Sequence, residues 1–179
     1  MTNYRRSDIA GASFFFTVNL ADRSQSLLIE HIALFRSAFE YARERHPFTV
    51  DAIVILPEHI HAIWTLPESD SDFALRWRLI KTMFSRGLPP GEFRSDSRLS
   101  KGERGIWQRR YWEHLIRDEA DFVRHVDYIH INPVKHGLVS CVADWPHSSF
   151  HRYVRKGLLP MDWAGDVGPG WDCGERRGD

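Results

Sequence analysis

The sequence predicts an α+β domain built on a mostly antiparallel sheet. Segments rich in β-branched and aromatic residues alternate with segments whose apolar residues recur every three or four positions, in the order β-α-β-β-α-β-α. Two of the strand segments lie only a few residues apart, which favours an antiparallel hairpin. This order is typical of a ferredoxin-like sandwich, and we expect helices on one face of the sheet plus a C-terminal extension.

The first half of the chain supplies three of the predicted strands. Residues 11–20, 48–56 and 59–66 are rich in β-branched and aromatic residues, and only a proline and a glutamate separate the last two segments. Residues 24–45 predict a helix, because a serine near its start is typical of a helix cap. The apolar residues on one face of this helix are Leu28, Ile32, Phe35 and Phe39.

The second half adds two helices and a fourth strand. Residues 72–86 predict a helix with its basic residues facing outward, and residues 87–105 predict a long exposed loop. Residues 106–117 predict the fourth strand. Residues 118–132 predict the next helix, because acidic residues suit its first turn and Pro133 disfavours helical geometry in the residue before it.

Composition changes near the C-terminus. Residues 145–156 predict one more short helix, and we place the end of a single domain, residues 1–159, shortly after it. Residues 160–179 are predicted to form a flexible acidic tail, because glycine and proline oppose regular structure there. The acidic residues of this tail are Asp162, Asp166, Asp172, Glu175 and Asp179.

Overall composition is ordinary for a soluble globular protein, with 42% hydrophobic and 27% charged residues. The polar start of the chain predicts no secretory signal, and no apolar stretch is long enough for a membrane span. The two cysteines form neither a disulfide framework nor a paired metal motif. We therefore expect a cytoplasmic protein without membrane contact.

The net charge is zero, but the charges are unevenly distributed. Ten lysines and arginines lie between positions 76 and 110, against only Glu92, Asp96 and Glu103. A neutral total can therefore hide a basic surface beside an acidic tail, and a basic surface favours a nucleic-acid partner. The alternative is a solvated basic helix and loop.

His59 and His61 are candidate metal ligands. On a predicted strand the side chains at i and i+2 leave the same face, so both imidazoles point together while Ile60 packs into the core. Two histidines placed in this way can chelate one metal ion. The pattern alone also fits two half-exposed strand histidines, and it occurs in unrelated metal enzymes.

Tyr128 and Asn132 form the second candidate pair. They lie four residues apart on a predicted helix and so share a face, and the amide oxygen of Asn132 could complete a two-histidine metal site. An ordinary tyrosine, with a pKa of about 10, is a poor nucleophile unless a metal polarises the phosphate that it attacks. Tyr111 is the rival nucleophile, but no amide ligand follows it four residues later.

These motifs together resemble a known family. The run P-E-H-I-H at residues 57–61 matches the His-hydrophobe-His motif of the HUH endonucleases, and Tyr128 with Asn132 matches their single-tyrosine transposase branch. More closely, N-Y-R-R near the start, F-F-T-V-N-L, and Y-I-H-x-N-P-V-K-H-G-L-V at residues 128–139 resemble the REP-associated tyrosine transposases. The resemblance covers residues 3–153.

The resemblance implies a metal-dependent transesterase that cleaves and rejoins single-stranded DNA at palindromic repeat hairpins. Tyr128 would attack a phosphate and leave a 5′-phosphotyrosine and a free 3′-OH. His59 and His61 would bind Mg²⁺ or Mn²⁺, with Asn132 as third ligand where insertion-sequence relatives carry a glutamine. The DNA partner adds an association with the nucleoid to the expected cytoplasmic location.

Proteins that bind single strands combine basic grooves with aromatic platforms. The residues that we predict to contact DNA are Arg5, Arg6, Arg76, Arg78, Lys81, Trp107, Arg109, Arg110 and Lys135. Arg5 and Arg6 resemble the family's N-terminal segment, which is associated with reading a short guide sequence beside the foot of a hairpin. As a set, these residues favour a hairpin with single-stranded flanks over plain duplex.

Insertion-sequence relatives work as dimers in which the tyrosine helix serves the partner's metal site. Here the segment after Leu138, with Trp145, Phe150 and Tyr153, could pack over the sheet edge where relatives pair, so we expect a monomer rather than a homodimer. The alternative functions are a non-catalytic DNA-hairpin-binding protein and a replication-initiator-like HUH nicking endonuclease. A small-molecule metal enzyme is less consistent with the sequence, which offers no further ligands in convincing spacing.

Overall fold

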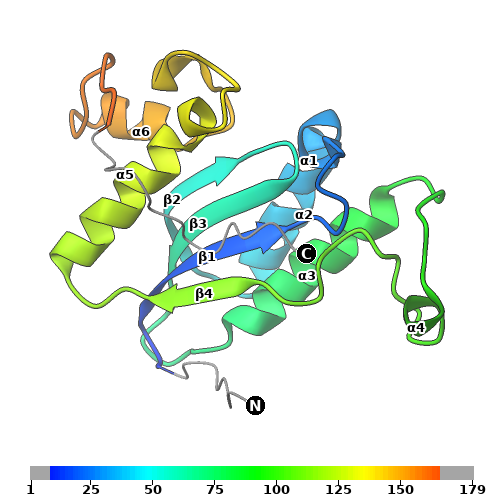
Figure 1. Cartoon of the computed structure of the whole chain (residues 1–179). Helices are drawn as coiled ribbons and strands as arrows, with labels where there is room; N and C mark the ends of the chain where they lie inside the picture. Colours follow the sequence, from blue (N-terminus) through cyan, green and yellow to red (C-terminus); the bar gives the residue numbers. More distant parts are fainter. Residues whose placement is uncertain (1–8, 166–179) are drawn as a thin grey trace, which may run out of the picture.

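The computed structural model describes residues 9–165 of the chain (Figure 1). Its centre is one four-stranded antiparallel sheet with the strand order β2-β3-β1-β4. The strands are β1 (Ser13–Asn19), β2 (Thr49–Ile55), β3 (His59–Thr65) and β4 (Trp112–Leu115). The helices are α1 (Leu27–Glu30), α2 (Ile32–Arg45), α3 (Phe73–Gly87), α4 (Asp96–Leu99), α5 (Glu119–Lys135) and α6 (Phe150–Arg155), with a 3₁₀ turn, η1 (Val142–Asp144).

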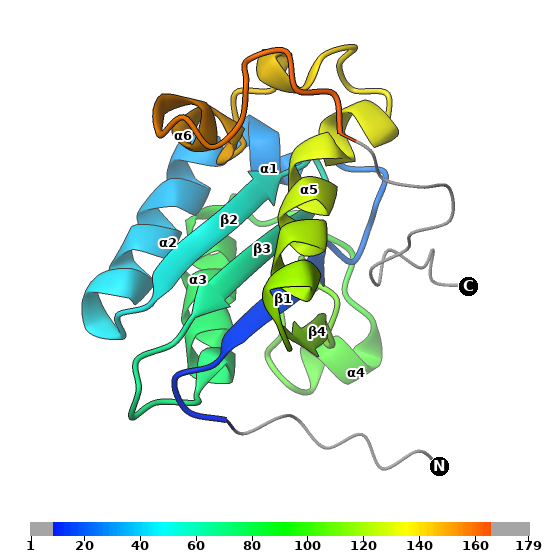
Figure 2. The ribbon, with the colours of Figure 1, turned by 90° about the vertical axis from the view of Figure 1, so that its left-hand side faces the viewer.

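Helices cover both faces of the sheet (Figure 2). Helices α2 and α3 pack on the face that carries Phe14 and Phe16, while α5 packs on the opposite face, against Phe15. The α+β class and the antiparallel sheet are confirmed, but the prediction of helices on one face is wrong. The three consecutive phenylalanines of β1 are fully buried, because this strand lies between two helical layers.

Two predicted boundaries need correction, those of the fourth strand and of α5, the helix that carries Tyr128. The fourth strand was predicted at residues 106–117, but only four residues pair with β1, and Trp107 makes an isolated bridge to Leu20 instead. Helix α5 continues through Pro133 rather than ending before it. The helix ends two residues later, where Gly137 adopts a left-handed backbone with φ of 68°. Pro133 therefore lies inside the last turn of α5, where it has no backbone N–H to donate to the carbonyl of Ile129.

Three smaller differences concern the other helices. The helix predicted at residues 24–45 is interrupted at His31, which separates α1 from α2. The predicted loop at residues 87–105 contains the short helix α4. The helix predicted at residues 145–156 is shorter, because the chain first pairs with β2 and only then forms α6.

The C-terminal extension covers the outer edge of β2. The amide of Ile55 donates to the carbonyl of His147 at 2.9 Å, and the amide of Ser149 donates to the carbonyl of Ile53 at 2.8 Å. The indole of Trp145 donates to the carbonyl of Ile55 at 3.0 Å. The extension therefore packs over a sheet edge, as the sequence predicts.

The described residues continue past the predicted domain end at residue 159. Trp163 contacts the rings of His130 and Phe150, with ring centres 6.2 and 6.1 Å away. The rest of the predicted acidic tail lies outside the described residues, as do Arg5 and Arg6. Within residues 9–165, no helix combines the length and the apolar character that crossing a membrane requires.

Candidate active site

His59 and His61 lie side by side on β3, on the face that α5 covers. Their Nε2 atoms are 3.1 Å apart, and both side chains are fully buried. Two ligands in neighbouring positions of an octahedral site with bonds of about 2.1 Å are separated by about 3.0 Å, so the pair can bind one ion. The expectation that Ile60 packs into the opposite core is confirmed.

The outer nitrogen of each imidazole has a partner that fixes its ring. His61 Nδ1 is hydrogen-bonded to Thr17 Oγ1 at 2.9 Å, and His59 Nδ1 donates to the carboxylate of Glu58 at 2.9 Å. Because this carboxylate can only accept, His59 carries a proton on Nδ1 and presents the lone pair of Nε2. Burial would raise the pKa of Glu58, but the hydrogen bond from His59 and the guanidinium of Arg23 hold it at about 2.

Tyr128 packs directly against this pair. Its ring centre is 5.2 Å from that of His61 and 6.1 Å from that of Phe15, and the side chain is 0% exposed. Lys135 lies two turns further along α5 and donates from Nζ to the phenol oxygen at 2.9 Å. The sequence predicts Lys135 as a DNA contact. In the structure its ammonium contacts the hydroxyl group of the candidate nucleophile.

Asn132 lies between two contacts that join α5 to the histidines. One helical turn before it, Tyr128 contacts His61; one turn after it, the ring of His136 lies 5.1 Å from that of His59. Asn132 is fully buried, and it shares its stripe of the helix with Tyr128. The structure thus aligns all four residues predicted for the site along one stretch of α5 and β3.

A second polar group lies nearer the start of α5. His114 of β4 and two residues of α5, Asp121 and His125, bring one potential ligand atom each within 4.8 Å of one another, so this group could hold a metal ion. The sequence analysis missed this group, because it forms only when the β4–α5 turn brings strand and helix together.

Hydrogen bonds already use much of the ligand capacity of this group. Asp121 accepts from His114 Nε2 at 2.8 Å, and His125 Nδ1 donates to the backbone carbonyl of Asp121 at 2.8 Å. The guanidiniums of Arg117 and Arg124 also lie 3.3 and 3.7 Å from the Asp121 carboxylate. A divalent ion would have to displace these cations, and the contacts join β4 to α5 without one.

The pKa shifts of this group also favour a structural role, in which the group joins β4 to α5. Burial would raise the pKa of Asp121, but the hydrogen bonds from His114 and the Arg117 backbone hold it at about 2. Burial lowers the pKa of His125, which favours the neutral ring. The group thus combines an ionised carboxylate with a neutral imidazole, an arrangement that holds the first turn of the tyrosine helix against the sheet.

Two relatives that are similar to this chain over nearly their whole length share one family name. No family model matches the chain. A REP-associated tyrosine transposase of Escherichia coli is 49% identical over 176 residues, which are 98% of each chain. A Haemophilus influenzae protein assigned to the same family is 51% identical over 168 residues, which are 93% of this chain and 95% of the relative.

The chain belongs to the REP-associated tyrosine transposases. The family resemblance predicted from the sequence is thereby confirmed. A solved structure of a REP-associated tyrosine transposase bound to a REP hairpin has the same fold, with a TM-score of 0.85 and 48% identity over all of both chains.

Two of the residues predicted to contact DNA in this family member are buried instead. Arg76 is 1% exposed, and its guanidinium donates to the Asp70 carboxylate at 2.7 Å and to three backbone carbonyls. Trp107 is buried too, and its indole donates to Ser85 Oγ at 3.1 Å. Their prediction as DNA contacts is wrong, because both side chains hold the fold together.

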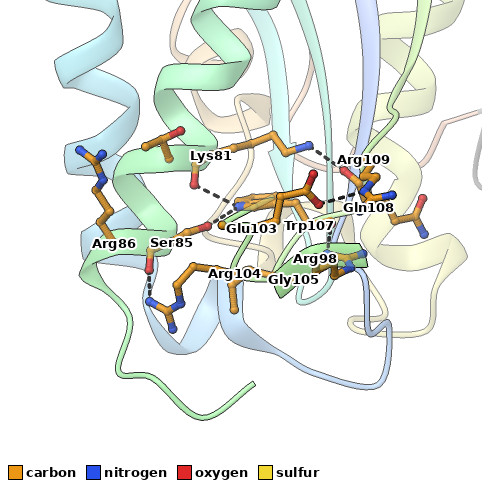
Figure 3. Close-up of a pocket in the computed structure, with 13 residues that line it drawn as sticks. Lys81, Ser85, Arg86, Arg98, Glu103, Arg104, Gly105, Trp107, Gln108 and Arg109 are labelled. Atoms are coloured by element: carbon orange, nitrogen blue, oxygen red, sulfur yellow. Dashed lines mark hydrogen bonds and ion pairs between the residues drawn. The ribbon is translucent and has the colours of Figure 1, made fainter. Parts of the chain in front are cut away.

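Two of the other predicted contacts, Lys81 and Arg109, line a cavity of about 530 Å³ beside α3 (Figure 3). Lys81 donates to the carbonyl of Gln108 at 2.8 Å, and Arg109 is paired with Glu103 at 2.9 Å. Arg78 and Arg110 are exposed, and no hydrogen bond or ion pair is recorded for either of them within residues 9–165. These two arginines fit the predicted role of DNA contact best.

Proposed function

We propose that the chain is a metal-dependent transesterase that cleaves and rejoins single-stranded DNA at palindromic repeat hairpins. The observation that carries the proposal is the packing of Tyr128 against His61, the neighbour of His59, with Lys135 on the tyrosine hydroxyl. Curated relatives at about half identity are named transposases, and the solved relative is bound to a REP hairpin.

His59, His61 and Asn132 would hold Mg²⁺ or Mn²⁺. Two imidazole nitrogens and an amide oxygen, completed by water and phosphate, suit a six-coordinate divalent ion. When bound, such an ion polarises the phosphate and stabilises the charge that develops on it. Glu58 and Thr17 keep the two imidazoles in place through their outer nitrogens.

Tyr128 is the nucleophile in this proposal. Its oxygen forms a bond to phosphorus, the bond from phosphorus to the 3′ oxygen breaks, and that oxygen leaves as a free 3′-OH with a proton. The product is a 5′-phosphotyrosine, and the reverse reaction rejoins the strand without a nucleotide cofactor. The ammonium of Lys135, 2.9 Å from the phenol oxygen, stabilises the negative charge on that oxygen as its proton leaves.

Tyr128 is 0% exposed, so a phosphate reaches it only after a neighbouring group moves. Lys135 is exposed, and its Nζ lies 4.5 Å from the centre of the tyrosine ring. An incoming phosphate competes with the phenol for this ammonium. DNA binding would therefore shift Lys135 enough to admit the phosphate, with its ammonium between the phosphate and the phenol oxygen.

The test uses labelled hairpin oligonucleotides with single-stranded flanks, incubated with the full chain and Mg²⁺ or Mn²⁺. We expect a covalent protein–DNA adduct, and we expect Tyr128→Phe to abolish it while hairpin binding survives. Tyr111→Phe is the matched control. An adduct formed by the Tyr128 variant, or lost only in the Tyr111 variant, would overturn the assignment.

The same assay tests the metal ligands. His59→Ala and His61→Ala should each eliminate cleavage and its dependence on divalent ions, because either change opens the chelate. Asn132→Ala should reduce cleavage less, since water can replace one oxygen ligand of a hard cation. Equal activity of both histidine variants with the wild type would exclude this site.

The assay also separates the alternatives. A non-catalytic hairpin-binding protein would retain the DNA without forming an adduct under any metal condition. A replication-initiator-like nicking enzyme would form the adduct but would not transfer the strand to a second labelled 3′-OH. We expect both adduct and transfer products.

A further inference from the structure

A row of paired residues crosses the sheet from the metal-ligand pair to its open edge. His61 of β3 pairs with Thr17 of β1, and Thr17 pairs with Trp112 of β4. Directly paired residues point to the same face, so Trp112 lies on the face of His61 and Tyr128. Two strand spacings of about 4.8 Å put Trp112 about 10 Å from His61 along this row.

Trp112 is 37% exposed, although most large rings on this face are buried. Its ring lies parallel to that of His114, at an angle of 7° and a distance of 5.7 Å between centres. It also contacts the ring of Phe15 edge-on at 5.7 Å, and Phe15 in turn contacts Tyr128. The indole therefore belongs to a continuous set of rings that ends at the candidate nucleophile.

The orientation of this indole is fixed from below. His114, on which it stacks, is hydrogen-bonded to Asp121, and it stacks on His125 at 4.7 Å with an angle of 21°. A surface tryptophan held in this way loses little rotational freedom when a second ring packs against it.

Exposed arginines lie close to Trp112 in the sequence and beside the Asp121 carboxylate that holds His114. Arg110 is exposed and lies two residues before Trp112, while the side chains of Arg117 and Arg124 are 67% and 57% exposed. Both of these guanidiniums face the Asp121 carboxylate from outside and remain accessible to phosphate oxygens. An exposed aromatic ring on a surface that also carries guanidiniums suits single-stranded nucleic acid, because the base stacks while the backbone is neutralised.

We propose that Trp112 stacks an unpaired base of the DNA strand that runs past the tyrosine. The inference rests on the proposed function for its substrate, and it adds a base-binding position outside the catalytic residues. A base inside a duplex keeps its faces covered by its neighbours, so this position selects a single-stranded flank. The stacked nucleotide lies close to the attacked phosphate, because Trp112 and His61 share one row of the sheet.

The experiment measures binding without cleavage, in buffer that contains a chelator and no divalent ion. The probe is a fluorescein-labelled hairpin oligonucleotide with single-stranded flanks, compared with the same hairpin without flanks. We expect Trp112→Leu to weaken binding of the flanked probe by about 5- to 100-fold and to leave the blunt hairpin unchanged. Trp112→Phe, which keeps a ring, should recover part of the affinity.

Abasic substitutions locate the stacked base. Removing that base should weaken binding by the wild type but have little further effect on Trp112→Leu, because the two changes delete the same contact. Tyr41→Leu is the matched control, since Tyr41 lies on α2, on the opposite side of the sheet, and contacts Arg45. Its affinity for both probes should equal that of the wild type.

Thermal unfolding of each variant shows whether it is correctly folded. If Trp112→Leu is unstable, binding by Trp112→Phe is compared with the wild type instead. The proposal fails if Trp112→Leu binds the flanked probe as the wild type does. It also fails if the loss is equal for flanked and blunt hairpins, which would indicate stacking on the hairpin end or a general effect. Loss of cleavage plays no part in these readouts, so failure of the proposed function is seen separately.

Discussion

Lys135 Nζ lies 2.9 Å from the phenol oxygen of Tyr128 and 4.5 Å from the centre of its ring. The two residues are seven positions apart on α5, which is nearly two full turns, so they share one face of the helix. This contact gives the candidate nucleophile a cation of its own, independent of any metal ion.

Lys135→Met should slow formation of the covalent adduct by about 10²-fold, the typical effect of removing one group that stabilises a developing oxyanion. Lys135→Arg should retain more activity, because it keeps the charge. Single-turnover cleavage with saturating hairpin DNA measures the step, and Lys156→Met, at the exposed end of α6, is the matched control. A faster adduct in Lys135→Met would show that Lys135 only blocks the tyrosine.

Arg76 and Arg78 should respond in opposite ways to the same substitution. Arg76→Met removes a buried guanidinium and leaves Asp70 without its cation, so the free energy of unfolding should fall by about 3 kcal/mol. Arg78→Met changes an exposed side chain, so stability should stay constant. DNA affinity should fall in the Arg78 variant, with a salt dependence reduced by about one counterion.

Urea unfolding and salt titrations of hairpin binding separate these two effects. Weaker DNA binding by Arg76→Met at full stability would restore Arg76 as a DNA contact.

His130 makes the packing of the C-terminal extension sensitive to acid. Burial, with a smaller contribution from the charge of Arg152, lowers its pKa from 6.5 to about 3. The ring is enclosed by Phe150, Tyr153 and Trp163, and its Nε2 is hydrogen-bonded to Ser149 Oγ at 3.0 Å. Protonation inside this apolar surrounding is therefore costly.

Below pH 6.5 the unfolded chain binds a proton at His130 that the folded chain does not, so stability falls as the pH drops toward 3. Between pH 6.5 and about 3, His130 lowers the free energy of unfolding by at most about 1.4 kcal/mol per pH unit. Above pH 6.5 it has no such effect. His130→Gln should flatten the decline, measured as urea midpoints at several pH values. An equal decline in His130→Gln and in the control His31→Gln would exclude His130 as the cause.

The sequence predicts the geometry of the candidate site well, because this geometry depends on local periodicity. The spacing of His59 and His61 on a strand, and of Tyr128 and Asn132 on a helix, determines which face each side chain takes. The same periodicity predicts that Arg76 is buried, because it lies three residues after Phe73 and four before Ile80, on the inward face of α3. Its charge led to the outward assignment, since buried arginines are rare without several acceptors.

Two other features of the site depend on where a helix ends and on the path of a turn, which the spacing of residue types does not specify. The sequence predicts that the helix with Tyr128 ends before Pro133, which leaves Lys135 outside the helix. The contact between Lys135 and Tyr128 could therefore not be predicted. The group of His114 with Asp121 depends on the turn between β4 and α5, whose path no pattern of residue types specifies.

The two edges of the sheet determine whether a second chain can pair with it. The C-terminal extension donates to and accepts from the outer edge of β2, and Arg152 and Tyr153 bond further carbonyls of that strand. An edge whose backbone groups are already bonded offers no template for a second chain. The opposite edge of the sheet is β4, which is only four residues long and therefore a poor surface for strand pairing.

We therefore expect a monomer whose own α5 completes its own site. Light scattering over a wide range of concentrations should give the mass of one chain, 20.9 kDa. Uncovering β2 with the double change Trp145→Ala and Arg152→Ala should promote self-association, because carbonyls of Ile55 and Val50 lose their donors. The matched control is Arg155→Ala, an exposed residue at the end of α6. A dimer mass in the wild type that persists on dilution would contradict the prediction, and mixing Tyr128→Phe with His59→Ala would then show whether subunits share a site.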